Sequence, residues 1–307
     1  MNPIECENLT RCFGRTPAVA GLNFTVPAGS VFALLGPNGA GKTTTLKLLL
    51  NLLRPTSGSA TVLGVASTRL RPVDFRRIGY VTEEQNLPEW MTLAQLLAYC
   101  RPFYPQWDDA LAARLQKQFD LPAHRALKQL SRGMRMKAAL LSTLAYRPEL
   151  LVLDEPFSGL DPLTRDDFVQ GLLELPGDDR PGTVLVSTHD IDDIERLADH
   201  VAFLASAKLV LAESADALRA RFRQIEITGG GHLIVAAGTP VATWLAWRQP
   251  SPNVVQFTDT AFQSGQTEAA LAARFPGAHV SARPMSLRQI FLVLAREQRG
   301  AGKEEAA

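Results

Sequence analysis

The chain has 307 residues, of which 46% are hydrophobic and 21% charged, and its 32 Lys and Arg against 31 Asp and Glu give a formal net charge of +1. This composition excludes a disordered or collagen-like chain and suffices for one large domain or two of medium size. Proteins that bind nucleic acid by neutralising phosphates carry a basic excess, which this chain lacks. Three cysteines without CxxC spacing, Cys6, Cys12 and Cys100, argue against a disulfide framework or a zinc site.

The N-terminal segment MNPIECENLTRCFGR has no cationic lead into an apolar run, so no secretory leader is expected. Residues 227–247 approach the length of a membrane span, but they contain three consecutive glycines at 229–231, Gly238 and Pro240. A strand followed by a short helix explains this stretch better than a membrane span does. We therefore expect a soluble chain from a reducing, cytosolic compartment.

Residues 1 to about 85 alternate β-like runs with Gly and Pro turns. Residues 31–35 form a continuous apolar run, which is typical of a strand buried on both faces of a sheet. A glycine-rich loop follows at 36–41, and the next segment, TTTLKLLLNLL, suits a helix. The predicted strands of this region are 4–9, 22–26 and 31–35.

From about residue 85 to 148 the pattern becomes helical, with three apolar-periodic segments separated by proline-containing breaks. Strands are predicted again at 150–153, 183–187 and 200–204, and helices at 164–175 and 191–198. This alternation indicates a largely parallel sheet. We predict one α/β domain over residues 1–220, with a helical subdomain at about 85–148.

A second, small α+β domain is predicted at residues 221–299, followed by a disordered tail at 300–307. Its predicted strands are 223–228, 232–238, 253–259 and 279–283, and its predicted helices are 241–247, 266–274 and 287–298. His232 and His279 are isolated, so this domain offers no metal or nucleophile constellation. Its sequence indicates no role.

The glycine-rich loop carries a complete GxxxxGK[ST] pattern between a predicted strand and a predicted helix. Its residues are Gly36, Pro37, Asn38, Gly39, Ala40, Gly41, Lys42 and Thr43. Glycines let backbone N–H groups close around phosphate oxygens, and the helix N-terminus adds positive partial charge. Lys42 is expected to reach the β- and γ-phosphates of ATP, Thr43 to bind Mg²⁺, and Thr44 to belong to the same nucleotide site.

Two carboxylates, Asp154 and Glu155, follow the apolar run at 150–153. In open α/β sheets, ligands bind at the carboxyl ends of the strands, where this pair would lie. Alone, the pair could equally be solvated charges at a strand end, but the upstream phosphate loop favours a catalytic role. We expect Asp154 to hold Mg²⁺ directly or through water, and Glu155 to polarise the attacking water.

Two further motifs are Leu130-Ser131-Arg132-Gly133-Met134 and Ser158-Gly159-Leu160-Asp161. With the phosphate loop, they resemble the ATP-binding cassette (ABC) ATPases, a family with the signature LSGGQ and a D-loop of the SALD or SGLD type. The resemblance covers about residues 2–220. It implies a P-loop NTPase cassette with a mostly parallel sheet, an antiparallel β part and a helical subdomain.

The same resemblance implies roles for single residues. Ser131 and Gly133 would contact the γ-phosphate of the ATP bound by a second protomer, and Asp161 would belong to that nucleotide interface. Phe13 would stack on adenine, for which any aromatic ring suffices. His189, at the end of a predicted strand, matches the family's γ-phosphate-sensing histidine, although a histidine there would by itself more often be structural.

The sequence departs from the family pattern at two places. Arg132 replaces the first glycine of the signature, and Met134 replaces its glutamine. Arg132 could add charge beside a phosphate or point to solvent, and we favour solvent. Glu83 stands where the family usually has a glutamine, and we assign it an oxygen toward Mg²⁺. Gln85 is the alternative equivalent of that glutamine.

Together these features predict the ATP-binding and ATP-hydrolysing subunit of an ABC transporter, which uses ATP and Mg²⁺ and dimerises on ATP. It would drive a separate membrane permease from the cytoplasmic face of the membrane. A narrower resemblance to ABC-2-type exporters lies in YVTEEQNLPEWMT and in MSLRQIF near the C-terminus. Trp90, Met91 and a stripe formed by Leu93, Leu96, Leu97 and Tyr99 are either part of the permease-docking groove or subdomain core.

Two other functions are compatible with a phosphate loop. A cytosolic ABC ATPase acting as a mechanical switch on ribosomes or DNA usually has two cassettes or a long coiled-coil insertion, and the near-zero charge gives no nucleic-acid footprint. A P-loop kinase or GTPase would not explain LSRGM and SGLD. We therefore expect no nucleic-acid partner.

Overall fold

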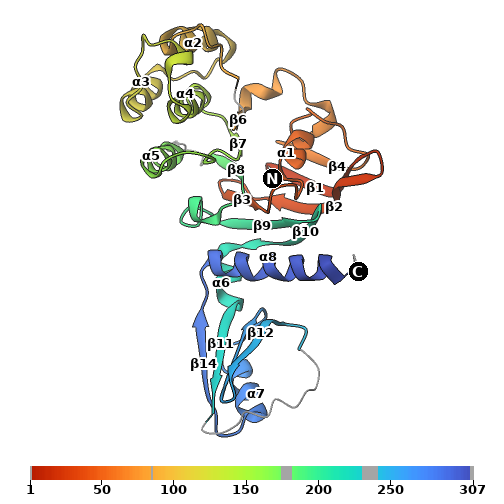
Figure 1. Cartoon of the computed structure of the whole chain (residues 1–307). Coiled ribbons are helices and arrows are strands. Elements are labelled where there is room, and N and C mark those ends of the chain that lie inside the picture. The colour runs from red at the N-terminus through yellow and green to blue at the C-terminus, as the bar shows by residue number, and fades with distance from the viewer. Residues whose placement is uncertain (1, 84–85, 174–181, 230–240, 305–307) are drawn as a thin grey trace. The chain divides into compact units, whose positions relative to one another are not determined.

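The computed structural model of the chain describes residues 2–83, 86–173, 182–229 and 241–304. The chain forms two compact units, Met1–Ala212 and Glu213–Ala307 (Figure 1). The predicted strand at 232–238, the end of the predicted helix at 164–175, and Gln85 lie outside the described residues. The boundary between the units lies a few residues before the predicted domain limit at 220.

An antiparallel sheet opens the first unit. Its strands, in the order β2-β1-β4-β5, are β1 (Ile4–Phe13), β2 (Thr16–Val26), β4 (Ser57–Val62) and β5 (Val65–Ala66). Ile4 lies opposite Val26 on one side and opposite Val62 on the other, and all three side chains are buried. Alternating buried and exposed positions along β2 show that one face of this sheet packs on the core.

A second, six-stranded sheet forms the centre of this unit, in the order β10-β9-β3-β8-β7-β6. Neighbours from β9 to β6 are parallel. Every residue of β7 and β8 is buried, as expected of strands covered on both faces. The strands are β3 (Val31–Leu35), β6 (Ile78–Thr82), β7 (Leu150–Asp154), β8 (Thr183–Thr188), β9 (His200–Ala205) and β10 (Lys208–Ser214).

Helix α1 (Lys42–Leu49) follows β3 directly, and the short helices η1 (Ser67–Arg69) and η2 (Asp74–Arg77) lie between β5 and β6. Helix α5 (Pro162–Leu173) lies between β7 and β8. The predicted α/β fold with a largely parallel sheet is confirmed.

The predicted helical subdomain is present as a cluster of α2, α3 and α4 (Figure 1). Thr92, Asp108 and Ser131 each accept a backbone N–H in the first turn of the helix that follows, so all three helices begin at a side-chain cap. The elements are α2 (Leu93–Cys100), η3 (Arg101–Phe103), α3 (Asp109–Gln118), η4 (Leu127–Gln129) and α4 (Arg132–Leu144).

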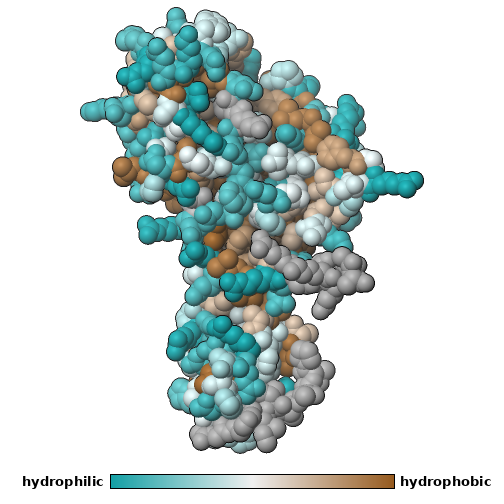
Figure 2. Space-filling model, in the orientation of Figure 1, coloured by the Kyte–Doolittle hydropathy of each residue, from teal (hydrophilic) through white to brown (hydrophobic). Residues whose placement is uncertain are grey.

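The apolar residues proposed for a docking groove divide between core and surface. Met91, Leu93 and Leu96 are buried in the subdomain, whereas Trp90 is 72% exposed and Tyr99 is also exposed. The face of the subdomain that Figure 2 shows is mostly hydrophilic. Trp90 and Tyr99 therefore remain available to a partner.

The second unit is an α+β fold built on an antiparallel sheet with the order β12-β13-β11-β14. Ile225, Ile227, Val255 and Phe257 of this sheet form a small core with Leu271 of α7. Its elements are α6 (Ala215–Arg221), β11 (Arg223–Thr228), β12 (Trp244–Ser251), β13 (Val254–Asp259), α7 (Gln266–Arg274), β14 (His279–Pro284) and α8 (Leu287–Glu304).

Three predictions about single elements were wrong. The segment predicted as a helix at 241–247 enters β12, because Trp244 and Trp247 stack with Phe257 of the neighbouring strand. The predicted helix at 191–198 is only the short η5 (Ile191–Asp193), in which the Asp190 side chain accepts the N–H of Asp192 and competes with helical bonding. Helix α8 continues to Glu304, so residues 300–304 are helical rather than disordered.

Among the described residues, no helix combines the length and the apolar character that a membrane crossing requires. The stretch at 227–247 that came nearest to such a pattern includes the end of β11 and the start of β12.

Candidate functional site

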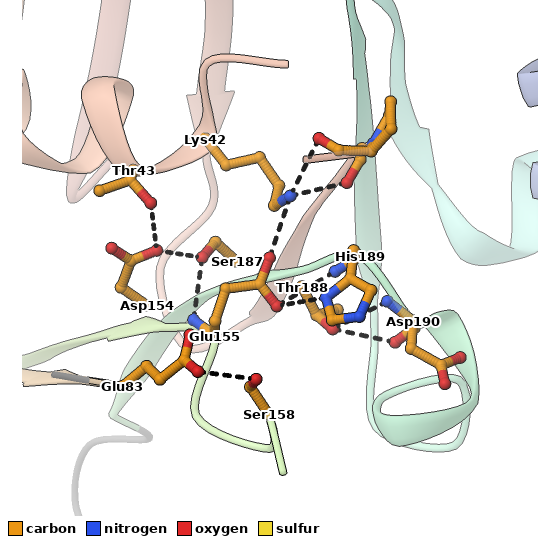
Figure 3. A network of polar contacts seen from close by, with 12 residues as sticks. Lys42, Thr43, Glu83, Asp154, Glu155, Ser158, Ser187, Thr188, His189 and Asp190 are labelled. Carbon is orange, nitrogen blue, oxygen red and sulfur yellow. Dashed lines mark hydrogen bonds and ion pairs between the residues drawn. The ribbon is translucent and has the colours of Figure 1, made fainter. Parts of the chain in front are cut away.

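The chemistry-bearing segments meet at one edge of the parallel sheet. In register, Leu35 of β3 lies opposite Thr188 of β8, and Asp154 of β7 lies opposite Ser187 of β8. Because parallel strands end at the same edge, the loops after β3, β7 and β8 converge there. The phosphate loop, the carboxylate pair and the Thr188-His189 segment are thus brought together, as Figure 3 shows for the residues that it labels.

The phosphate loop needs glycine at two positions for steric reasons. A Cβ on Gly36 would lie 2.4 Å from the carbonyl oxygen of Leu204 in β9, and a Cβ on Gly41 would lie 2.3 Å from that of Ala18 in β2. Gly41 also has φ of +104°, which side-chain-bearing residues rarely adopt, and it is the N-cap of α1. Loop and helix start are therefore fixed by backbone packing from two strands.

The remaining residues of the loop are placed as follows. Asn38 and Gly39 lie at the exposed tip, whereas Ala40 is buried and its N–H donates to the carbonyl of Pro37 at 3.1 Å. Thr44 is half-buried in the first turn of α1. This chain turn places the first N–H groups of α1 at the loop, where they can bind an anion.

Lys42 is only 5% exposed, and its ammonium group lies inside the loop. Nζ donates to the carbonyl oxygen of Gly36 at 2.7 Å and to that of Pro37 at 3.3 Å, and it lies 3.0 Å from Oε1 of Glu155. The expected phosphate ligand and the expected catalytic base are therefore direct neighbours.

Asp154 lies at the centre of a small oxygen cluster. Its Oδ1 accepts the hydroxyl of Thr43 at 3.0 Å and the hydroxyl of Ser187 at 2.6 Å (Figure 3). Burial raises the pKa of the Asp154 carboxyl, while the hydrogen bonds from Ser187 and Thr43 act in the opposite direction. A carboxylate and a hydroxyl within hydrogen-bond distance of each other are oxygen donors of the kind that Mg²⁺ prefers.

Glu155 joins the Lys42 side to His189. Its Oε2 lies 2.8 Å from Nδ1 of His189 and accepts the backbone N–H of the same residue at 3.3 Å. Its own N–H donates to the carbonyl and the hydroxyl of Ser187, both at 3.1 Å. Glu155 adopts φ of +49°, an uncommon conformation for a residue with a side chain, at the turn that directs it toward Lys42.

Glu83 lies beside this cluster, and its backbone N–H donates to the carbonyl of Asp154 at 3.0 Å. Its Oε1 accepts the hydroxyl of Ser158 at 2.9 Å and pairs with the guanidinium of Arg132. The prediction that Arg132 points to solvent is therefore wrong, because its guanidinium is paired with Glu83. The assignment of Glu83 to Mg²⁺ stays a prediction.

The signature residues lie at the start of α4. The Ser131 hydroxyl accepts the N–H of Met134 at 3.2 Å and caps the helix. Gly133 packs closely against Thr164 of α5. A Cβ added at residue 133 would lie only 2.9 Å from the methyl carbon of Thr164. Asp161, just before α5, accepts both the N–H and the hydroxyl of Thr164, and these bonds lower the pKa of its carboxyl.

Phe13 ends β1 on the antiparallel sheet, where its ring is half-exposed. The guanidinium carbon of Arg11 lies 4.8 Å from the ring centroid, so a cation already faces the ring. Stacking of Phe13 on adenine stays a prediction.

Ser187 and Ser158 belong to the site although the sequence predicts no role for either. Ser158 stands in the SGLD motif, and Ser187 ends the predicted strand at 183–187. Ser187 bonds to Asp154 because the parallel register sets the two opposite each other, and Ser158 bonds to Glu83 across two loops. Neither contact follows from spacing along the chain. A serine directly preceding the Thr188-His189 pair was the one available signal for Ser187.

Comparison with known proteins identifies the family. A family model described as "ABC transporter" matches residues 19–158. Nod factor export ATP-binding protein I of Burkholderia lata is 36% identical over 221 residues, which cover 70% of this chain and 72% of that protein. The chain belongs to the ABC transporter ATP-binding proteins.

Two further similarities agree with this membership. The probable multidrug ABC transporter ATP-binding protein YbhF of Escherichia coli is 35% identical over 226 residues, which are 71% of this chain but only 38% of YbhF. A solved structure of an ATP-binding subunit of an ABC transporter has 27% sequence identity and a TM-score of 0.63 over 70% of this chain and 91% of the other.

The family membership also distinguishes between the functions predicted from the sequence. The relatives named above are transporter components, and the cassette fold is confirmed. The alternative of a cytosolic switch on ribosomes or nucleic acid is therefore not favoured. The family model's match at residues 19–158 lies within the first unit, and the two longer matches each cover about 70% of the chain.

Proposed function

We propose that this ABC protein binds and hydrolyses ATP to drive a separate membrane permease of the export type. The observation that carries the proposal is the contact of Lys42 and His189 with the two carboxylate oxygens of Glu155, beside the Thr43-Asp154 pair. This network supports the assignment of a phosphate ligand, a general base and a metal site to one sheet edge.

The phosphate loop binds the nucleotide in this proposal. The N–H groups at the start of α1 and the Lys42 ammonium group receive the β- and γ-phosphates, since both are preorganised donors for anions. Residues 36–44 surround the phosphates, and Phe13 offers a ring for the adenine. Loss of the Gly41 conformation would disturb all these donors together.

Thr43 and Asp154 fit Mg²⁺, because they supply a hydroxyl and a carboxylate oxygen 3.0 Å apart. The described residues contain no group of three His, Cys, Asp or Glu side chains suited to a metal. This agrees with an ion that is held by one or two protein oxygens and otherwise by phosphates and water. When bound, Mg²⁺ neutralises negative charge on the transferred phosphoryl group.

Glu155 acts as the general base in this proposal. It accepts a proton from the attacking water, and ATP and water become ADP and phosphate. His189 orients the Glu155 carboxylate through Nδ1 and presents its ring toward the γ-phosphate. Lys42 and Glu155 must partly separate during this reaction, because the ammonium group also serves the phosphates.

Two protomers would complete the nucleotide site. The N-terminus of α4, with Ser131 and Gly133, presents N–H groups that a second protomer could supply to the γ-phosphate, and Asp161 lies in the neighbouring loop. ATP would then join the protomers, and hydrolysis would release them. The partner is a second copy or a paired cassette.

The exposed Trp90 and Tyr99 of the helical subdomain are our candidates for contact with the permease. The names of the relatives, one for Nod factor export and one for a probable multidrug transporter, support an export role. Action on a permease from the cytoplasmic face of the membrane is part of the proposal. No substrate follows from these names.

Two measurements test the proposal. The purified full chain should hydrolyse Mg²⁺-ATP, and it should co-purify from detergent-solubilised membranes with a multi-span membrane protein encoded beside it. A Trp90→Ala variant should lose that association while it keeps basal hydrolysis. Recovery with ribosomes instead of membrane protein would contradict the transport role, and absence of hydrolysis would contradict the ATPase assignment.

A further inference from the structure

We infer that Arg132 is a positioning residue that, paired with Glu83, holds the start of the signature helix against the D-loop. This inference rests on the proposed ATPase function. Arg132 and Glu83 are two of the three positions, with Met134, at which the chain departs from the usual family pattern, and the structure brings these two into contact.

Arg132 is the first residue of α4, and its guanidinium meets two other segments at once. Nη2 pairs with Oε1 of Glu83, directly after β6, and that same oxygen accepts the hydroxyl of Ser158 at 2.9 Å. The guanidinium also lies over Gly159, where an added Cβ would be 3.1 Å from Nη1. One side chain therefore joins the signature helix, the residue after β6 and the D-loop.

The electrostatics explain why the two departures belong together. An arginine at a helix N-terminus faces the positive end of the helix dipole, so it gains from a nearby carboxylate. A glutamine at 83 would leave the charge of Arg132 without this partner, and a glycine at 132 would leave the Glu83 carboxylate without its guanidinium. The pair works as a unit, and either change alone breaks it.

The pair contributes to position rather than to overall stability. The side chains of Arg132 and Glu83 are 48% and 37% exposed, and exposed ion pairs stabilise folded proteins little. A second contact joins the signature helix to the D-loop. Gly133 packs on Thr164, whose hydroxyl donates to Asp161 of the D-loop. Arg132 thus fixes the orientation of a contact that packing already makes possible.

The inference also assigns a role to Glu83. Its Oε1 is held by Arg132 and Ser158, so the carboxylate faces the D-loop side rather than the Thr43-Asp154 pair. In this inference Glu83 acts through Arg132 on the signature, in place of the role at Mg²⁺ predicted from the sequence, and the Mg²⁺ requirement of the protein does not depend on the charge of Glu83.

A double-mutant cycle in the full chain tests the inference. Glu83→Gln and Arg132→Gln should each lower kcat for ATP about three- to tenfold with little change in KM, and the double variant should be about as slow as either single one. The half-saturating Mg²⁺ concentration should stay unchanged in all three. Arg135→Gln, the same charge change one turn further along α4, is the control and should keep wild-type kcat.

Hydrogen exchange supplies a readout that does not need hydrolysis. In both single variants, amides of residues 131–136 and 158–164 should exchange about two- to fivefold faster, with no larger effect in the double variant. Independent, multiplying effects on kcat, a Mg²⁺ shift confined to Glu83→Gln, or unchanged exchange would each overturn the inference. If the wild type lacks ATPase activity, the proposed function fails, and the exchange data still decide whether the pair positions α4.

Discussion

Lys42 and Glu155 form a largely buried ion pair, with Nζ 3.0 Å from Oε1 and exposed fractions of 5% and 13%. The pair connects the phosphate loop to the strand end of β7, and its carboxylate also contacts His189. Each residue therefore influences the position and charge environment of the other, but we expect them to act on different steps of the ATPase cycle. Lys42 would govern nucleotide binding, and Glu155 would govern turnover.

Lys42→Ala should weaken ATP binding about ten- to a hundredfold, because it removes a charge-assisted contact to phosphate. The affinity can be measured by calorimetry with the full chain. Lys47→Ala, an exposed lysine in the same helix, is the matched control and should bind as the wild type does. Undiminished affinity in Lys42→Ala would count against Lys42 as the phosphate ligand.

Gly41→Ala should reduce both ATP affinity and thermal stability, because the new Cβ would lie 2.3 Å from the carbonyl of Ala18 at φ of +104°. Gly21→Ala is a suitable control, since Gly21 also has positive φ, +64°, but nothing lies within 4 Å of an added Cβ. It should show the conformational cost, about 1 kcal/mol, without loss of affinity. Equal affinities in the two variants would disprove the steric account of the loop.

Asp108 caps α3 and also binds Arg147. Its carboxylate accepts the N–H of Leu111 at 2.8 Å, and it accepts Nε and Nη2 of the Arg147 guanidinium at 2.9 and 2.7 Å. Asp108→Ala should lower the free energy of unfolding by about 1 to 2 kcal/mol at pH 7, and Asp108→Asn by less, because Asn can still cap. Urea titration of the full chain measures both.

The same residue predicts a pH dependence. Hydrogen bonds from Leu111 and then Arg147 hold the pKa of Asp108 below its ordinary 3.8. A lowered pKa in the folded state means that the contribution is complete above the ordinary pKa and is lost as pH falls through the lower, folded value. The gap between wild type and Asp108→Ala should thus be constant from about pH 7 to 5 and shrink below about pH 4. A gap that grows in acid would contradict this linkage.

The local parts of the site could be predicted from sequence. The phosphate loop and the Asp154-Glu155 pair each lie within one strand-loop segment, where apolar runs and glycines define the backbone. The contacts of Ser187 with Asp154 and of Arg132 with Glu83 depend on strand register and on the placement of α4. Spacing along the chain carries no information about either.

The errors in secondary structure have local causes. At 191–198 the Asp190 side chain forms a turn bond that replaces a helical one, and at 241–247 the two tryptophans stack on Phe257 from the next strand. The first effect could have been inferred from an aspartate in that position. The second is a tertiary contact that overrides local preference.

The Glu155→Gln variant tests the central claim, ATP hydrolysis at this site, most directly. The amide cannot accept a proton from water, whereas the phosphate loop is unchanged, so ATP binding should persist and a nucleotide-bound dimer should accumulate. Glu7→Gln, an exposed glutamate of β1, is the control for the same chemical change.

The decisive measurement is the rate of Mg²⁺-ATP hydrolysis by purified wild type, Glu155→Gln and Glu7→Gln at saturating ATP. We predict that Glu155→Gln is slower by about a hundredfold or more and still binds ATP, while Glu7→Gln matches the wild type. Hydrolysis by Glu155→Gln at the wild-type rate would contradict the account.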